Sequence, residues 1–571
     1  MALPRGRASR SAAAPFPSAC FLLFLLLTAS SSLLSGPTSD ADDEPPRSNE
    51  QVGSCEALQS IAGGEARCRY LRSHARCSPS GYIDYLRLFY CGFAGFPAAV
   101  GLAALALWLA VLFYLLGDTA SEYFCASLEG LSAALRLPPA VAGVTLLSLG
   151  NGAPDVFATV VSFAPSPSTA GGSGAVGLSS ALGGALFVST VVAGTVALSV
   201  AGRRGGGGGV VVEWRGFVRD LCFLLLALCY LLAVLLNGAV TVWVAASFVS
   251  IYVAYVVVVW TSHCCAAEHS KPLSDPLLLL LDSTTTHPSC RPTPRRRPPQ
   301  TADDDATRTY SSRRALHCCL RVLCMPLYLP RRLTIPDIAA HRWSRAHAVA
   351  SAALAPILLA ATWAFSSSSS SHRRSLAVLL CAAFLGLALA VLAFATTDPA
   401  HPPRGRVPWL AAGFLMSVLW AYTLARELVA LLVAIGYVVG VKASVLGVTV
   451  LAWGDSLGDL VSNVAMAVHG GPGGAQAALS ACYAGPLFNT VVGLGVSMAM
   501  AAAGKTPEPF VVPVDAAAYE AVAFLGAAVA WAMFVVPVRG MRVDRVYGVG
   551  LLAIYLCFFA VRTFDTLGFW R

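Results

Sequence analysis

Two segments of this chain place carboxylate, amide and hydroxyl side chains at helical spacing inside long apolar stretches. The polar stripes are Thr145, Asn151 and Asp155 in the first segment, and Thr449, Asp455 and Asp459 in the second. A carboxylate at the centre of a lipid layer is opposed by about 2.5–3.5 kcal/mol or more, and such residues usually face a cavity, a partner or an ion. Oxygen ligands without sulfur or imidazole suit hard cations, so the pattern predicts a cation site.

The two segments are copies of one another. Residues 143–155 align with residues 447–459 without a gap, and six of the thirteen positions are identical. About twenty residues further on, Gly-Ala-Leu-Phe at 184–187 matches Gly-Pro-Leu-Phe at 485–488. The repeat therefore covers a pair of helices, and its duplication argues against an isolated buried polar pair.

Both motifs contain residues that favour an interruption of the helix. These are Gly150, Gly152 and Pro154 in the first motif, and Gly454 and Gly458 in the second. Proline cannot donate a backbone hydrogen bond, and glycine lets the backbone turn. We therefore expect broken helices with free carbonyl oxygens beside the carboxylates.

The composition shows which class of protein positions these motifs. Only 12% of the residues are charged and 56% are hydrophobic, whereas soluble domains carry roughly 25% charged residues. The apolar runs last about 20 residues or more without alternation, which excludes a membrane β-barrel. The fold class is an all-α polytopic membrane protein.

We expect about 12 to 13 transmembrane helices, the thirteenth being an uncleaved N-terminal helix. The twelve predicted spans are 88–116, 138–163, 175–200, 217–236, 239–260, 347–365, 376–396, 408–434, 436–468, 475–502, 510–536 and 546–566. Seven spans separate the helix near 88 from its counterpart near 408, and an odd number reverses the direction of crossing. The two copies are therefore predicted to be inverted repeats, which are typical of secondary transporters.

The charges and cysteines predict the remaining organisation. The expected divisions are a signal-like segment at 1–36, a non-cytosolic cysteine-containing stretch at 37–87, a first transmembrane repeat at 88–260 with its motif at 137–200, a cytosolic disordered basic loop at 261–346, an extra helix pair at 347–396, and a second transmembrane repeat at 397–571 with its motif at 439–502. Cys55, Cys68, Cys77 and Cys91 could form two disulfides in any of three pairings.

The motif pair resembles the two alpha-repeat motifs of the cation/calcium exchanger (CCX) family, the plant-type branch of the sodium/calcium exchanger superfamily. The resemblance implies ten core helices, five in each inverted repeat, with ions bound between the second and third helices of each. It implies metal ligation by the residues Asp155, Asp459, Asn151, Asp455, Thr145, Thr449, Ser456 and Asn489. Val188 stands where other branches carry a polar counterpart of Asn489, and Asp replaces the Glu of many calcium-selective members.

The activity implied by this resemblance is antiport by alternating access, without an enzymatic reaction. Calcium or another cation would exchange for sodium, potassium or protons, all bound as substrates. The expected partners are inorganic cations and the lipid bilayer. We expect no cofactor, no bound nucleic acid and no obligate protein partner. The signal-like start predicts an endomembrane or plasma membrane location, and the resemblance favours the vacuolar membrane.

Two other functions stay open at this point. A cation channel could use the same acidic cavity without coupling two fluxes. An intramembrane aspartyl protease could use two aspartates as a catalytic dyad, but its signature needs Tyr-Asp and Gly-x-Gly-Asp, whereas Asp155 follows Pro154 and the second motif reads Leu457-Gly458-Asp459.

Charged residues outside the motifs are given structural roles. Asp118 and Glu122 follow the first predicted span and are expected to be solvated. Arg426 and Glu427 lie inside the span at 408–434 and are expected to form an ion pair or to extend toward the membrane surface.

Overall fold

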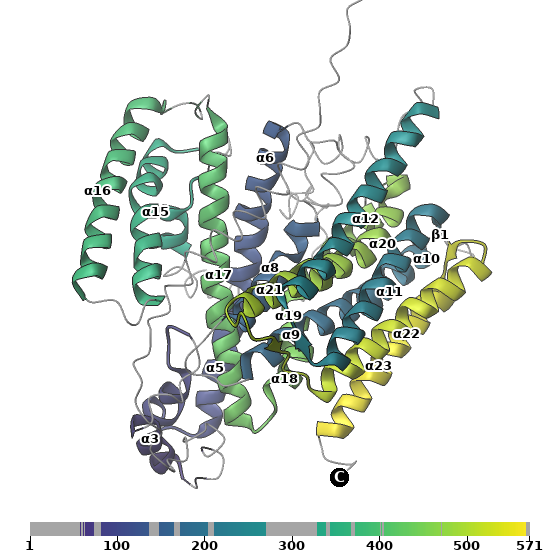
Figure 1. Cartoon of the computed structure of the whole chain (residues 1–571), viewed down its shortest axis with the longest axis horizontal. Helices are drawn as coiled ribbons and strands as arrows, with labels where there is room; N and C mark the ends of the chain where they lie inside the picture. Colours follow the sequence, from purple (N-terminus) through teal and green to yellow (C-terminus); the bar gives the residue numbers. More distant parts are fainter. Residues whose placement is uncertain are drawn as a thin grey trace, which may run out of the picture.

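The architecture is known from a computed structural model in which nearly all of the described chain is helical (Figure 1). The structure describes residues 58, 61, 63–73, 81–135, 148–164, 172–203, 210–269, 328–337, 343–366, 372–399, 401, 403, 405–469 and 471–566. The signal-like segment at 1–36 lies outside these residues, as do Cys55 and Cys77.

The first half of the molecule contains one long helix followed by four helical rods. Its elements are α3 (Gly64–Ser73), α4 (Tyr85–Arg87), η1 (Leu88–Gly92), α5 (Ala98–Thr119), η2 (Ala120–Cys125), α6 (Ala126–Leu135), α8 (Ser148–Phe163), α9 (Gly172–Phe187), η4 (Val188–Val192), α10 (Ala193–Arg203), β1 (Val210–Val211), α11 (Trp214–Asn237), β2 (Ala239–Val240) and α12 (Val242–His269). The η segments are π-helical turns within longer helices.

The second half repeats this order after a helical hairpin. Its elements are α15 (Arg345–Ser366), α16 (His372–Thr396), α17 (Arg406–Val439), α18 (Ala443–Leu446), η5 (Gly447–Leu451), α19 (Ala452–His469), α20 (Gly471–Phe488), η6 (Asn489–Leu494), α21 (Gly495–Ala503), β3 (Phe510–Val511), α22 (Ala516–Val538), β4 (Arg542–Val543) and α23 (Arg545–Thr566).

The four short strands show how the two halves interlock. β1, which precedes α11, pairs antiparallel with β4, which lies between α22 and α23. β2, which lies between α11 and α12, pairs antiparallel with β3, which precedes α22. Exchanging the two halves converts one pairing into the other. This reciprocity is what a pair of repeats related by a two-fold rotation requires.

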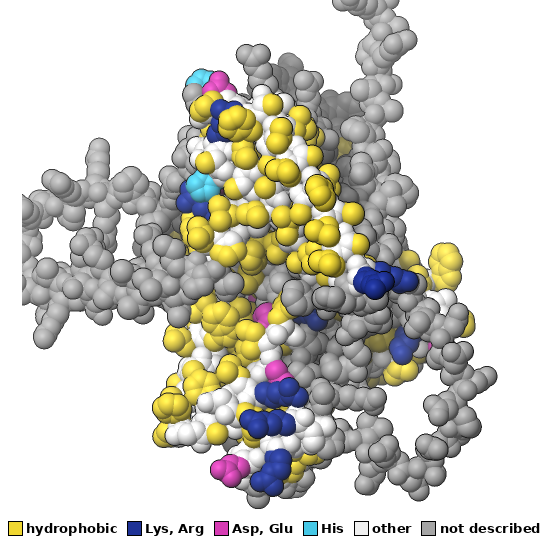
Figure 2. Space-filling model, turned by 90° about the vertical axis from the view of Figure 1, so that its left-hand side faces the viewer, with side chains coloured by type: hydrophobic (Ala, Val, Ile, Leu, Met, Phe, Trp, Pro, Cys, Tyr) yellow, Lys and Arg dark blue, Asp and Glu magenta, His cyan; other side chains and the backbone are white. Residues whose placement is uncertain are grey.

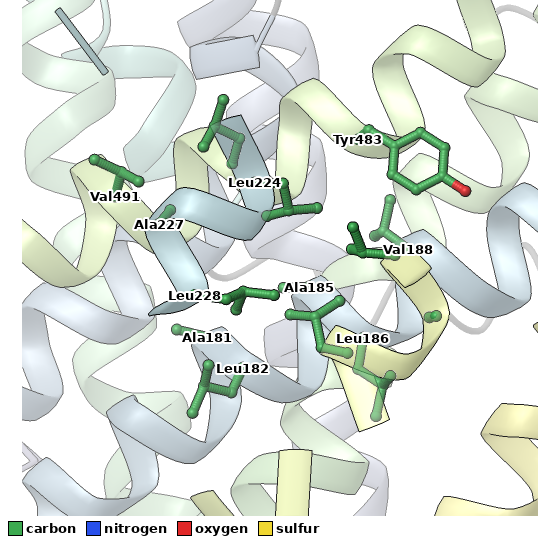
Figure 3. Packing of buried hydrophobic residues seen from close by; sticks show 14 of the residues in the cluster. Ala181, Leu182, Ala185, Leu186, Val188, Leu224, Ala227, Leu228, Tyr483 and Val491 are labelled. Atoms are coloured by element: carbon green, nitrogen blue, oxygen red, sulfur yellow. The ribbon is translucent and has the colours of Figure 1, made fainter. Parts of the chain in front are cut away.

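The helices obey the same reciprocity. α10 packs on α23 while α21 packs on α12, and α11 packs on α20 while α22 packs on α9. One apolar core therefore combines α9 to α12 with α20 to α23. Figure 3 shows part of it, to which α9, α11 and α20 contribute Ala185, Leu228 and Tyr483. A second core joins α5, α8 and α17 with the N-terminal segment.

The extra hairpin lies outside both cores. α15 and α16 pack on each other on the far side of α17 (Figure 1). Phe384, Leu387 and Val391 of α16 are exposed. Figure 2, which views the molecule from the side on which α16 lies in Figure 1, shows many hydrophobic side chains on that face. Apolar side chains on the outer face of a helical hairpin are what contact with lipid favours.

The described residues contain eleven helices that are long and apolar enough to cross a membrane. They correspond to eleven of the twelve predicted spans. The remaining span, predicted at 138–163, contains α8, whose described part begins at Ser148 and whose apolar part, Gly152–Phe163, is shorter. The chain is thus a multi-pass membrane protein.

The first predicted span is displaced. Its helix begins at Ala98, not near residue 88, because Pro97 is its N-cap. Proline fixes its own backbone and cannot donate to a preceding turn, which favours a helix start. Residues 85–92 form separate short turns instead. Cys91 in those turns is bonded to Cys68, which selects one of the three disulfide pairings.

The predicted helix interruption is wrong for the described parts of both motifs. α8 runs through Gly152 and Pro154, and α19 runs through Gly454 and Gly458. The departure from α-helical geometry in the second motif comes earlier, in η5. The expected free carbonyl nevertheless has a source, because Pro154 offers no N–H to the carbonyl of Gly150, four residues earlier.

The prediction of a disordered basic loop at 261–346 is wrong at both described ends. α12 extends to His269, and residues 328–334 form a helix. Ile335 is buried against Tyr123, Met416 and Trp420. An apolar cluster of this kind provides the burial that a disordered segment lacks.

Candidate functional site

The carboxylate of Asp155 is held at the contact between the two halves. Its side chain is only 3% exposed. The side-chain amide of Asn489, the first residue of η6, donates a hydrogen bond of 2.7 Å from Nδ2 to Asp155 Oδ2. The space for this amide exists because Gly152 has no side chain. A Cβ there would lie 2.0 Å from Asn489 Oδ1.

Gly184 shows a second convergence of the two motifs. A Cβ at this position would lie 3.3 Å from Asp155 Oδ1 and 3.5 Å from Ser456 Oγ. The carboxylate of the first motif and a hydroxyl of the second therefore face the same point on α9. Ser456 is fully buried. A side chain at Gly184 would press on Asp155 Oδ1, whereas nothing lies within 4 Å of a Cβ at its repeat counterpart Gly485.

α19 presents two further carboxylates one helical turn apart. Asp455 is 8% exposed and Asp459 is half-buried. Both interact electrostatically with Asp155. Neither oxygen of the Asp455 carboxylate has a hydrogen-bond partner among the described residues. Like charges at this spacing destabilise a helix unless something positive lies between them.

Most of the buried side-chain oxygens that lack a hydrogen-bond partner among the described residues belong to these motif helices. They are Asp155 Oδ1, Ser179 Oγ, Ser180 Oγ, both carboxylate oxygens of Asp455, Ser456 Oγ, Asn463 Oδ1, Asn489 Oδ1 and Thr490 Oγ1. An unpaired buried polar group costs about 1–3 kcal/mol. A dehydrated hard cation would satisfy such oxygens, because carboxylate, amide and hydroxyl oxygens are its preferred ligands.

This set adds residues that the sequence prediction did not include among the ligands. Ser179 and Ser180 lie on α9, and Thr490 follows Asn489 in η6; all three are buried. A signal for Ser179 was present in the sequence, since Leu178-Ser179 is repeated as Leu479-Ser480. Ser180 carries no such signal, because its counterpart in the other half is Ala481, whereas Thr490 has a hydroxyl counterpart in Ser189.

For three predicted ligands the structure does not show a side-chain oxygen without a partner in the site. The hydroxyl of Thr449 donates to Val445 O of its own helix at 2.7 Å, which leaves only its lone pairs for an ion. Thr145 lies outside the described residues, and Asn151 is described only as part of α8.

The three aspartates do not form one tight ligand cluster. Within the described part of the chain, no group of three His, Cys, Asp or Glu side chains is arranged to hold a metal ion. Mutual repulsion favours this separation, and Asn489 already occupies one oxygen of Asp155. A cation here would bind few carboxylates together with neutral oxygens.

The two halves of the site are chemically unequal. Val188 begins η4 as Asn489 begins η6, and it is buried without any polar group. The next residue, Ser189, instead donates to the carbonyl of Cys482 at 3.5 Å. That carbonyl is free of a helical donor because Pro486 lies four residues later. At this pair of positions the second half therefore offers a polar side chain to the site and the first half does not.

Glu427 and Asp118 have partners that the sequence did not reveal. The Glu427 carboxylate accepts hydrogen bonds from the Tyr82 N–H and, at 2.7 Å, from the Tyr85 hydroxyl, while the Arg426 guanidinium lies 4.9 Å from the centre of the Tyr82 ring. Asp118 is not simply solvated, because it forms an ion pair with the buried side chain of Arg331. Both acids connect segments far apart in sequence.

Comparison with known proteins gives matches across both halves. The profile of the family described as "Sodium/calcium exchanger protein" matches residues 105–261 and 409–564. Cation/calcium exchanger 1 of Arabidopsis thaliana is 42% identical, over 92% of this chain and 94% of that protein. The human mitochondrial sodium/calcium exchanger protein is 30% identical, over 88% of each chain.

Among solved structures, the H+/Ca2+ exchanger CAX aligns with 90% of this chain and 93% of its own, at 11% identity and a TM-score of 0.39. The assignment of the family therefore rests on the sequence matches, which include both motif helices and the helices around them. This chain belongs to the sodium/calcium exchanger protein family.

Proposed function

We propose that this protein is a membrane antiporter that exchanges calcium for sodium, potassium or protons at the site between α8 and α19. The observation that carries the proposal is the set of buried oxygens without partners, contributed by both halves of the molecule. The names of the relatives, cation/calcium exchanger and sodium/calcium exchanger protein, support the same substrate class.

The proposed ligands are the predicted residues with three additions. Asp155, Asp455 and Asp459 supply charge, while Ser456, Asn489, Thr449, Thr145 and Asn151 supply neutral oxygens, and Ser179, Ser180 and Thr490 join them. A dehydrated cation in this site would replace water by protein oxygens. Different cations would compete for the same oxygens and occupy the site in turn.

The proposed mechanism is alternating access. The two cores suggest the moving parts: α9 to α12 with α20 to α23 form one body, and α5 with α17 forms the other. Motion of the second body against the first would expose the site to one side and then to the other. The reciprocal packing of the halves supports two such states, because inverted repeats can exchange conformations.

The organisation of the chain is part of the proposal. The repeats at 88–260 and 397–571, with motifs at 137–200 and 439–502, form the transport unit, and the pair at 347–396 is an addition to it. We place the protein in an endomembrane, with the vacuolar membrane as first candidate and the plasma membrane as the alternative. The basis is the signal-like start and the similarity to plant relatives.

Calcium exchange in reconstituted vesicles tests the function. Radioactive calcium uptake is measured while the trans concentrations of sodium, potassium and protons are varied one at a time. We expect uptake against a calcium gradient that is driven by at least one of these ions. Calcium flux that runs only downhill and ignores the trans ion would indicate a channel and would contradict the proposal.

Substitution of the acids tests the site. Asp155→Asn and Asp459→Asn keep the size of each side chain and remove its charge, and we expect each to reduce exchange at least about 100-fold. The matched control is Asp565→Asn, at an aspartate that is 53% exposed at the end of α23. Parental rates in both motif variants would refute the assignment.

Family membership already excludes the alternative function of an intramembrane aspartyl protease.

A further inference from the structure

The last part of the insertion between the two halves is anchored to α5. Residues 328–337, which we call the strap, contain Arg331, whose side chain is 1% exposed. Its guanidinium donates to Leu115 O at 3.0 Å and to Thr119 Oγ1 at 2.8 Å, and it pairs with Asp118. These partners use both terminal nitrogens of the buried guanidinium, whereas its Nε has no hydrogen-bond partner among the described residues. The ion pair and the two hydrogen bonds offset much of the cost of burying this charge, so the contact is specific.

The strap is anchored to α17 as well. The indole of Trp420 donates to Thr334 Oγ1 at 2.7 Å. A Cβ on Gly413 would lie 2.7 Å from the carbonyl oxygen of Pro336, so the strap approaches the backbone of α17 where a side chain is absent. Ile335 is buried against Met416 and Trp420, and Leu358 of α15 packs on this cluster. One short segment therefore joins α5, α17 and the extra hairpin.

The same two helices are joined again about two helical turns further along. The hydroxyl of Tyr85 accepts from the Trp108 indole of α5 at 3.1 Å and donates to Glu427 of α17 at 2.7 Å. The pair is thus bridged at two levels by segments that do not belong to it. Such double bridging limits the motion of α5 relative to α17.

α5 also contacts the cation site directly. A Cβ on Gly454 would lie 2.2 Å from the ring of Phe113, so α5 packs tightly on α19 at the residue next to Asp455. Phe113 is about four residues, or roughly 6 Å along the helix axis, from the anchor at Leu115 to Thr119. The anchor and the site are therefore connected through a single rigid helix.

We infer that the strap holds α5 and α17 together as one body during the transport cycle and thereby sets the rate of exchange, not the affinity for cations. The inference rests on the proposed exchange for its rate measurement. The role of this part of the insertion is thus to hold two membrane-spanning helices in a fixed relative position. The strap is expected to stay attached to α5 and α17 in every state, because the hydrogen bonds of Arg331 and Thr334 join it to these two helices of the moving body.

Kinetics of two neighbouring arginine variants test this role. Arg331→Ala removes the anchor, and we expect the maximal exchange rate to fall roughly 2- to 30-fold, the range of coupling residues, with an unchanged half-saturating calcium concentration. Arg332→Ala removes the same charge from the same helix, but within the described parts of the chain the Arg332 side chain bonds only to Tyr328 of the strap itself. It should exchange at the parental rate. A parental rate for Arg331→Ala would overturn the inference.

A covalent cross-link in place of the Arg331–Asp118 ion pair gives a second test. Recovery of the exchange rate upon cross-linking cannot result from a variant that is merely misfolded. In Asp118→Cys/Arg331→Cys, a short bis-maleimide should link the strap to α5. A protease site inserted within 270–327 shows the link, since the two fragments then stay together on a denaturing gel. N-ethylmaleimide, the parent and each single Cys variant serve as controls.

We expect the double variant to be slow before linkage and to regain most of the parental rate after it. Exchange that stops upon linkage would show that the strap must detach, and would overturn the inference. The parent's own exchange is measured first. A parent without exchange refutes the proposed function, whereas an exchanging parent with a fast unlinked double variant refutes the strap alone.

Discussion

The amide of Asn489 and the carboxylate of Asp155 form a 2.7 Å hydrogen bond that connects η6 of the second half with α8 of the first. No equivalent bond exists on the other side, because the residue in the position of Asn489 is Val188. The bond fixes the orientation of one oxygen of Asp155 and leaves the other unpartnered and free for an ion.

Loss of this amide is expected to weaken cation binding. Asn489→Ala removes the donor that orients Asp155, and the apparent affinity for calcium should fall about 10- to 100-fold, as for other residues that support metal ligands. Val188→Ala truncates the corresponding position of the other half and should leave the affinity unchanged. The measurement is the calcium dependence of exchange in vesicles; equal affinities in the two variants would contradict the role of Asn489.

Gly152 is predicted to be necessary for the same bond. In Gly152→Ala the new methyl group would occupy the place of Asn489 Oδ1 and push the amide away from Asp155. The variant should lose affinity as Asn489→Ala does, and the double variant should be no worse than either single one. Gly526→Ala is the control, since nothing lies within 4 Å of that position. Fully additive losses would show that the two residues act separately.

The buried carboxylate of Glu427 is expected to hold the N-terminal segment on α17. Tyr85→Phe removes a hydrogen bond to a charged group and should lower stability by about 1.5–3 kcal/mol. Tyr82→Phe keeps the backbone N–H that also bonds Glu427 and should cost less. Thermal unfolding of the detergent-solubilised protein measures both. Equal effects, or none from Tyr85→Phe, would contradict this contact.

Stability at acidic pH should depend on Asp515, the N-cap of α22. Burial alone raises its pKa, but hydrogen bonds from the Ser444 hydroxyl and the Ala516 N–H, with the charges of Lys442 and Arg562, outweigh it and bring the pKa below the ordinary value of 3.8. A lowered carboxyl pKa stabilises the folded state above the ordinary value, and this contribution is lost as the pH falls through the lowered one.

Acid unfolding of variants at this position checks the sign. The parent should lose stability as the pH falls from about 4, the ordinary carboxyl range, whereas Asp515→Asn should lack this component of the loss. Ser444→Ala removes one of the bonds that lower the pKa, so its acid-induced loss should be smaller than that of the parent and should be complete at a higher pH. Identical pH profiles for all three proteins would refute the prediction.

The sequence by itself determined the class of protein, the repeat and most of the candidate site. The low content of charged residues and the long apolar runs require a helical membrane protein. In lipid every backbone N–H and C=O group must be hydrogen-bonded within the protein, and a helix achieves this within one segment. The thirteen-residue duplication gave Asp155, Asp455 and Asp459 without any structure. Local signals suffice for such features because periodicity and composition are properties of a single segment.

The tertiary structure decided everything that depends on contacts between distant segments. Neither the bond from Asn489 to Asp155 nor the burial of Arg331 against Asp118 has a local signal, since the residues are hundreds of positions apart. The continuity of α8 through Pro154 contradicts the break predicted from the sequence, because neighbouring helices can hold a proline-containing helix in place. Packing, and not propensity, made these choices.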